Sequence, residues 1–156
     1  SNSNAFRHCV FHSQGAAAHA MYSPAADNYM EYCVSWSDST LAIGGGSGAI
    51  SNLVNSILIG SPVLGNAALS PAMKASYNIL FPASGSIVHS TEESLAGLQR
   101  VNTNWYNNTV ADPKFVNAEG FDFHLLSAEG FVSNGVWATN PVVGFSPGID
   151  FGPRED

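Results

Sequence analysis

Apolar and polar residues recur in the same order in four short stretches of the chain. The stretches read FRHCVFH from Phe6, MEYCVSW from Met30, LVNSILI from Leu53 and ASYNILF from Ala75, and they align without gaps. Their first residues lie 24, 23 and 22 positions apart. A nearly constant period with one extended apolar run in each period is typical of solenoids, whose coils bury their surfaces against neighbouring coils. We therefore expect four stacked coils.

Each coil also contains a second, less regular extended run, reached through residues that favour turns. These runs are AHAMY at 18–22, TLAI at 40–43 and GSIV at 85–88. Alternation along the first run places the columns of Phe6 and Val10 on the inside and the column of Arg7 and Glu31 on the outside. The pattern predicts an all-β solenoid of parallel strands.

One segment has the pattern of an α-helix. It spans 90–100 and reads STEESLAGLQR, in which Ser90 and Glu93 form a capping-box pair and Arg100 falls in the last turn. We therefore divide a single domain into β-helix coils at 1–89 and a short helix with a terminal segment at 90–156. Since the chain opens inside a repeat and stops without an evident cap, we expect it to be a piece of a longer polypeptide.

The terminal segment resembles that of a known family. The run VADPKFVNAEGFDFHLLSAEG at 110–130 and the SPGIDFG at 146–152 are similar to the ADPxFV, DFHL-type and SPxID elements of bacterial right-handed parallel β-helix repeat proteins, in the pectate-lyase-like superfamily. SYNILF at 76–81 resembles the last regular coil before that segment. The resemblance implies a right-handed parallel β-helix with one short α-helix and an irregular C-terminal segment. Such proteins include polysaccharide-degrading enzymes and surface proteins without an assigned reaction.

Composition narrows the classes of partner. The chain has 156 residues, of which 11% are charged and 45% hydrophobic, with a net charge of −7. The acidic balance argues against nucleic acid and anionic membranes as partners, and no run of 18 apolar residues is present to span a bilayer. Low charge with many hydroxyl and amide residues is usual in secreted β-rich proteins. We expect a secreted or cell-surface protein whose partners are a polysaccharide or glycan and either the remainder of the parent polypeptide or a stacked subunit.

Two cysteines, Cys9 and Cys33, fall in one column of the alignment. Parallel strands lie about 4.8 Å apart, within the Cα separation that a disulfide tolerates. Stacked free thiols are the alternative, since free Cys is often a small buried hydrophobe. No CxxC or HxxxH set accompanies them, and the GxGxxA match in IGGGSGA at 43–49 has no acid at the required distance. We expect no metal and no cofactor.

Candidate site residues cluster on the first two coils. Glu31, Asp38 and Arg7 are the catalytic candidates, because hydrolysis needs two carboxylates and a lyase needs a base with cations for the substrate carboxylate. His12, Trp36 and Tyr32 are the substrate-binding candidates, since aromatic rings stack on sugar faces. The leading hypothesis is a polysaccharide-binding or polysaccharide-processing protein, lyase-like or glycosidase-like, in which this chain gives the C-terminal coils. The alternative is a non-catalytic adhesin, filament or assembly subunit.

Overall fold

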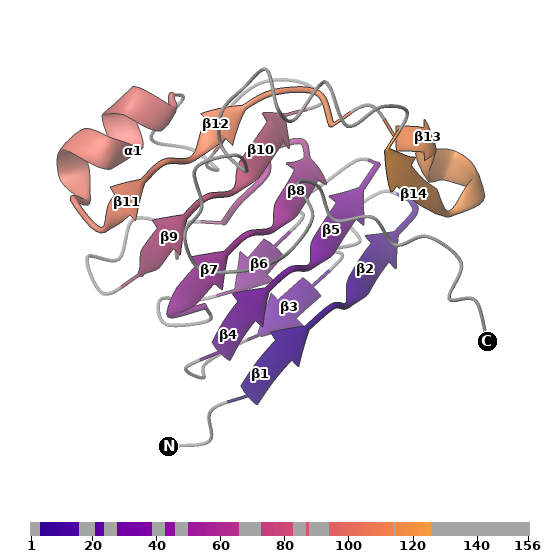
Figure 1. Cartoon of the computed structure of the whole chain (residues 1–156), viewed down its shortest axis with the longest axis horizontal. Helices are drawn as coiled ribbons and strands as arrows, with labels where there is room; N and C mark the ends of the chain where they lie inside the picture. Colours follow the sequence, from indigo (N-terminus) through magenta and orange to yellow (C-terminus); the bar gives the residue numbers. More distant parts are fainter. Residues whose placement is uncertain are drawn as a thin grey trace.

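The protein is mostly β-structure, organised in two five-stranded parallel sheets (Figure 1). The computed structural model describes residues 4–15, 21–23, 28–38, 43–45, 50–65, 73–82, 87, 94–113 and 115–125. The first sheet consists, in spatial order, of β1 (Asn4–Arg7), β4 (Asn28–Glu31), β7 (Asn52–Val54), β9 (Lys74–Ser76) and β11 (Trp105–Tyr106). The second consists of β2 (Val10–Ser13), β5 (Val34–Ser37), β8 (Ile57–Gly60), β10 (Ile79–Pro82) and β12 (Thr109–Val110).

Each strand of the first sheet leads directly into a strand of the second, after which the chain returns to the first sheet beside its earlier pass. Two short strands on the return path, β3 (Met21–Ser23) and β6 (Ile43–Gly45), also pair in parallel. The strand register confirms the columns expected from the sequence, because Phe6 pairs with Met30 and Val10 pairs with Val34. This mostly parallel arrangement is compatible with a solenoid.

A fifth repeat follows the four that the sequence pattern identifies. Residues 105–111 read WYNNTVA, and Trp105 pairs with Ala75 while Thr109 pairs with Ile79. This repeat starts 30 residues after the fourth, because an α-helix is inserted between them. We number the seven positions of each repeat from its first residue, so that the repeats are 6–12, 30–36, 53–59, 75–81 and 105–111.

The helix α1 spans Leu95–Val101 and begins later than the sequence pattern predicts. Its N-cap is Ser94, which has extended backbone angles and whose side chain accepts a hydrogen bond from the Gly97 amide at 3.0 Å. The expected capping pair of Ser90 and Glu93 lies outside the described residues. Arg100 is in the last turn as expected, where its charge complements the helix dipole.

A sharp corner joins the two sheets in every repeat, and the backbone of the residue at the third position forms this corner. This residue has a positive φ, between 51° and 59°, in all five repeats, namely in His8, Tyr32, Asn55, Tyr77 and Asn107. Only a few per cent of non-glycine residues adopt this left-handed conformation, so its recurrence marks a built feature of the repeat. Because this residue interrupts strand alternation, the fourth position points into the corner.

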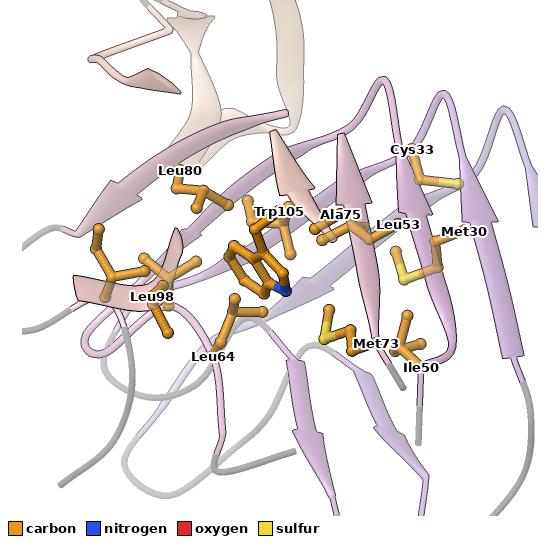
Figure 2. Close-up of a cluster of buried hydrophobic side chains, with 13 residues drawn as sticks. Met30, Cys33, Ile50, Leu53, Leu64, Met73, Ala75, Leu80, Leu98 and Trp105 are labelled. Carbon is orange, nitrogen blue, oxygen red and sulfur yellow. The ribbon is translucent and has the colours of Figure 1, made fainter. Parts of the chain in front are cut away.

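The corner changes which columns face the interior. Positions 1 and 6 line the main core, where Met30, Leu53, Ala75 and Trp105 form one row (Figure 2) and Leu58 packs with them. Val34, Ile57 and Ile79 at position 5 belong to a second cluster with Trp36 and Ile59. The expected inward direction of the Phe6 column is confirmed. The Val10 column is buried at Val34, Ile57 and Ile79, but it packs in the second cluster and not with the Phe6 column. Leu58 lies between Ile57 and Ile59, and neighbouring strand residues point to opposite faces.

The second cluster is partly covered by a short antiparallel hairpin. It comprises β13 (Phe115–Asn117), the 3₁₀ turn η2 (Ala118–Gly120) and β14 (Asp122–Leu125), and Phe115 packs against the cluster. β14 contains the expected DFHL strand. The remainder of the expected terminal segment, including 146–152, lies outside the described residues.

Fourth-position side chains form a hydrogen-bonded row inside the corner. The Cys33 amide donates to Ser56 Oγ at 3.1 Å, and the Ser56 amide donates to Asn78 Oδ1 at 2.9 Å. The Asn78 amide in turn donates to Asn108 Oδ1 at 3.1 Å. Each link joins two repeats, so the row fixes their stacking.

The two cysteines begin the same row as free thiols, which is one of the two arrangements that the sequence leaves open. Cys33 is fully buried, and its Sγ donates to the Glu31 carbonyl oxygen at 3.3 Å. Burial raises the pKa of the Cys33 thiol to about 11. The Cys9 Sγ is half-buried and donates to the Arg7 carbonyl oxygen at 3.2 Å.

Candidate functional site

Positions 2 and 3 of the five repeats form a line along the corner, with exposed polar and aromatic side chains at its two ends and buried Asn55 and Ser76 between them. We call it the corner ridge. It consists of the residues at positions 2 and 3, which are Arg7, His8, Glu31, Tyr32, Val54, Asn55, Ser76, Tyr77, Tyr106 and Asn107. Neighbouring members of one column are separated by the strand spacing of about 4.8 Å. The ridge is thus a linear array of residues whose accessible side chains lie mainly in its first two and last two repeats.

An ion pair lies at the β1 end of the ridge. Arg7 Nε donates to Glu31 Oε2 at 2.7 Å, and the two side chains are 62% and 31% exposed. The hydrogen bond with Glu31 raises the pKa of the Arg7 guanidinium. Such an exposed pair stabilises the fold little, because water screens it. It does hold a guanidinium and a carboxylate together at the surface, where both can bind hydroxyl groups.

Aromatic rings lie beside the ion pair and at the opposite end of the ridge. The His8 and Tyr32 rings stack with centroids 5.3 Å apart and an interplanar angle of 6°. The Tyr77 and Tyr106 rings meet edge to face at 5.9 Å. Tyr106 is 51% exposed. The ridge therefore presents aromatic surface to solvent at both ends.

A second group of side chains lies on the outer face of the second sheet. We call it the His12 cluster, comprising His12, Trp36, Asp38 and Phe121. The His12 ring stacks on Trp36 with centroids 4.4 Å apart, and the Phe121 ring meets it edge to face at 4.4 Å. Phe121 belongs to the hairpin and is 61% exposed. The cluster thus joins the hairpin to strands β2 and β5.

Desolvation lowers the pKa of His12, and the negative charge of Asp38 opposes this shift. Asp38 itself accepts hydrogen bonds from the Gly15 amide at 3.1 and 3.2 Å. This carboxylate follows β5 and holds the turn after β2 in place. The contacts of the His12 cluster therefore explain these residues as structural ones, which hold the hairpin and the turn after β2 against the second sheet.

The structure divides the expected site residues between these two groups. Arg7, Glu31 and Tyr32 come together on the corner ridge. His12, Trp36 and Asp38 lie in the His12 cluster, where Trp36 is only 8% exposed. Its ring has little free surface on which a sugar could stack.

The expected carboxylate pair lies at opposite ends of one strand. Strand β5 separates Glu31 from Asp38, and its four residues span about 13 Å. Glycosidases place their two carboxyl groups roughly 5 to 10 Å apart. The arrangement does not favour this pair as a hydrolytic site, although its catalytic role stays an untested prediction.

Three aromatic residues of these two groups were not among the expected site residues. Tyr77 occupies the same column as Tyr32, so the alignment of repeats contained the signal needed to find it. Tyr106 could be placed only with the fifth repeat, whose spacing differs from the others. Phe121 lies outside the repeats, and its contact with His12 depends on how the hairpin packs.

Two further searches of the described residues bear on the class of site. No group of three or more His, Cys, Asp or Glu side chains among them is arranged to hold a metal ion. No helix in this part of the chain is long and apolar enough to cross a membrane.

Comparisons of the chain with protein-family models, with curated proteins and with solved structures found no match in any of the three.

Proposed function

We propose that this chain is a right-handed parallel β-helix module of a secreted or cell-surface protein and that it binds polysaccharide along the corner ridge. The fold part of the proposal is supported by two five-stranded parallel sheets connected in register. It is also supported by the resemblance of the 110–125 segment to the terminal segment of pectate-lyase-like proteins. The low charge and net charge of −7 suit an extended, largely uncharged ligand.

One observation supports the choice of ligand more than any other. The Arg7–Glu31 ion pair lies next to the stacked His8 and Tyr32 rings, on the same edge of two adjacent strands. Tyrosine combines an apolar ring with a polar hydroxyl and suits surfaces that are half apolar and half wet. A sugar presents an apolar ring face together with hydroxyl groups at its rim. The aromatic rings can therefore pack on the sugar's apolar face, and the charged side chains can bind its hydroxyl groups.

The linear form of the ridge favours a chain of sugars over a single one. Tyr32 and Tyr77 lie two repeats apart, with Asn55 between them, which corresponds to about 10 Å at the strand spacing. Tyr106 follows one repeat later. A polysaccharide running across the strands would meet the side chains of the first two and last two repeats and pass over the buried Asn55 between Tyr32 and Tyr77.

The geometry supports binding more than cleavage. Glu31 is engaged by Arg7 at 2.7 Å, and Asp38 is held by the Gly15 amide at the far end of β5. Hydrolysis requires two carboxyl groups that face one another across the scissile bond, whereas these two lie at opposite ends of β5. Processing of the polysaccharide would then depend on residues other than this pair.

A polysaccharide-binding screen with paired variants tests the proposal. Wild-type protein, Tyr32→Ala and Glu31→Gln would be applied to immobilised glycans and insoluble polysaccharides, with reducing-end and unsaturated products assayed in parallel. We expect retention of the wild type without product, and at least tenfold weaker retention of both variants. Phe121→Ala is the matched control, because it removes an exposed aromatic ring from the His12 cluster.

Loss of retention in Phe121→Ala with full retention in Tyr32→Ala would move the binding surface to the His12 cluster. Absence of retention on every polysaccharide would overturn the proposal. Release of product that Glu31→Gln abolishes would show that the ridge also catalyses a reaction.

Assembly is a second candidate function, and one feature favours it. Strands β1 and β2 are the outermost strands of their sheets at the same end of the molecule (Figure 1). A non-catalytic adhesin or filament subunit would use such an end to associate.

A further inference from the structure

Two pairs of aromatic rings lie on the corner ridge with a gap of one repeat between them. His8 stacks on Tyr32 in the first two repeats, and Tyr77 meets Tyr106 in the last two. Between them the third repeat contributes Asn55, whose side chain is fully buried. A ligand that runs along the ridge therefore contacts one ring pair, crosses a repeat without an aromatic ring on the ridge, and then contacts the second ring pair.

The distance across the gap follows from the strand register. Met30 pairs with Leu53 and Leu53 pairs with Ala75, so Tyr32 and Tyr77 lie at equivalent places two strand spacings apart. Two spacings are about 10 Å, and the whole ridge crosses four spacings, or about 19 Å. The ligand must therefore be extended, and it must present similar surfaces at intervals of about 10 Å.

The geometry of the sugar linkage decides which polysaccharides have this form. In a chain of β-1,4-linked pyranoses, both linking bonds leave the ring equatorially on opposite sides. The chain is therefore extended, and each sugar advances it by nearly one strand spacing. Each sugar is also rotated by half a turn relative to its neighbour, so alternate sugars present the same face in the same direction. An α-1,4-linked glucan leaves the ring axially at one end, and it coils away from a linear surface.

Charge distinguishes neutral chains from acidic ones. With His counted as neutral, the charged ridge residues are Arg7 and Glu31, and they already bind each other at 2.7 Å. Lys74 on β9 is exposed, but it lies two positions before the ridge residue Ser76. A polyuronate carries one carboxylate on every sugar. A protein with a net charge of −7 and one compensated cation on the ridge repels such a chain.

We propose, on the premise that the ridge binds polysaccharide, that its ligand is a neutral β-1,4-linked polysaccharide bound as an extended two-fold ribbon. One sugar packs at Tyr32, the next crosses the buried Asn55, and the third packs at Tyr77. The sugars beyond these reach His8 on one side and Tyr106 on the other. Five sugars fill the ridge, one for each repeat.

The spacing of the ring pairs predicts how affinity depends on ligand length. Two linked sugars reach one ring pair, whereas three extend from Tyr32 to Tyr77 and contact both pairs at once. The second contact is then intramolecular and adds to the first. We expect affinity to rise about tenfold between the disaccharide and the trisaccharide. The rise with further sugars should be smaller.

Isothermal titration calorimetry of the chain with three sets of oligosaccharides tests the proposal. The first set comprises β-1,4-linked oligomers of glucose, mannose or N-acetylglucosamine, from two to five sugars long. The second comprises α-1,4-linked glucose oligomers of the same lengths, and the third comprises oligogalacturonates. We expect at least one β-1,4-linked series to bind about tenfold or more tightly than the other two sets, with the step in affinity at three sugars.

A pair of tyrosine variants tests the origin of that step. Tyr77→Ala removes the second contact, so three sugars should bind it no more tightly than two. Tyr29→Ala is the matched control, because Tyr29 is 39% exposed on β4 and lies three residues before Tyr32, off the ridge. This variant should keep the step. The comparison of linkage and length in the wild type does not depend on how well either variant folds.

The outcomes separate this ligand assignment from the binding proposal on which it rests. Saturable binding of α-1,4-linked or acidic oligomers with equal or greater affinity would overturn the assignment and leave polysaccharide binding standing. The assignment would also be overturned by β-1,4-linked oligomers that show no step at three sugars, or by equal losses in Tyr29→Ala and Tyr77→Ala. Absence of binding by every oligomer would overturn both proposals.

Discussion

Asn78 and Asn108 occupy the fourth position of neighbouring repeats, and the Asn108 side-chain oxygen accepts two hydrogen bonds from Asn78. One comes from the Asn78 backbone amide at 3.1 Å and the other from its side-chain amide at 2.8 Å. Asn78 also donates to the Leu53 carbonyl oxygen at 2.9 Å. Both asparagines are buried, so these bonds form away from water, where an unmade bond is costly.

Replacing Asn78 should therefore destabilise the protein strongly. Asn78→Ala removes the side-chain partner of the Ser56 amide and of the Leu53 carbonyl oxygen, and it removes one of the two hydrogen bonds that Asn108 Oδ1 accepts. We expect the free energy of unfolding to fall by about 3 kcal/mol or more. Urea denaturation measures it. The control is Asn52→Ala, whose hydrogen bond to Ser51 is 3.4 Å long and half-buried, and equal losses in the two variants would contradict the account.

The left-handed corner makes a separate prediction at Tyr77, whose φ is 59°. Asn adopts this conformation readily, whereas a β-branched residue is strained in it. Tyr77→Val should be less stable than Tyr77→Asn by about 1–2 kcal/mol, since both variants lose the same contact with Tyr106. Thermal and urea unfolding of the pair would decide this, and a valine variant as stable as the asparagine variant would refute it.

Alkaline pH should weaken the fold through Cys33. Burial raises the pKa of its thiol to about 11, whereas an unfolded thiol ionises near pH 8.5. Between these values the folded state keeps a proton that the unfolded state releases, so this contribution to stability is complete below about pH 8.5 and is lost as the pH rises toward about 11. Cys33→Ala should unfold with a shallower pH dependence over this range. Parallel pH profiles for variant and wild type would count against the assignment.

Acidic pH should act on the His12 cluster. The pKa of His12 is lowered by desolvation, so its contribution to stability is present above its ordinary pKa and is lost as the pH falls through its pKa in the folded state. Phe121→Ala should raise this pKa by letting water reach the ring. Asp38→Asn should lower it further, because the opposing charge is removed. An NMR titration of the His12 ring protons measures both shifts, and shifts in the same direction would be inconsistent with these causes.

The sequence was sufficient to predict the register of the first four repeats. The columns of Phe6 and Val10 align because each repeat carries apolar residues at fixed offsets, and the strands pair in that register. The fifth repeat was missed because α1 lengthens the interval to 30 residues. Its residues also differ in type, with Trp105 in place of Ala75 and Thr109 in place of Ile79.

Side-chain direction was harder to predict than register. Strand alternation applied across the whole repeat places Val10 inside, but the left-handed third position interrupts it. Glycine often marks that conformation in a sequence, but the third position is occupied by residues such as His8 and Tyr32. The alignment of the repeats placed Arg7 beside Glu31 correctly, because both lie before the corner. It also grouped His12 and Trp36 with them, whereas these two residues lie beyond the corner on the second sheet.

The most direct test of the corner ridge is an NMR titration of the protein with an oligosaccharide prepared from a polysaccharide that it retains. Saturable shift changes should concentrate on the Tyr32, Tyr77 and Tyr106 rings and on the Arg7 Nε proton, which follow one another along the corner. Changes confined to Trp36 and Phe121, or no saturable change at the ridge, would contradict the proposal that this protein binds polysaccharide there.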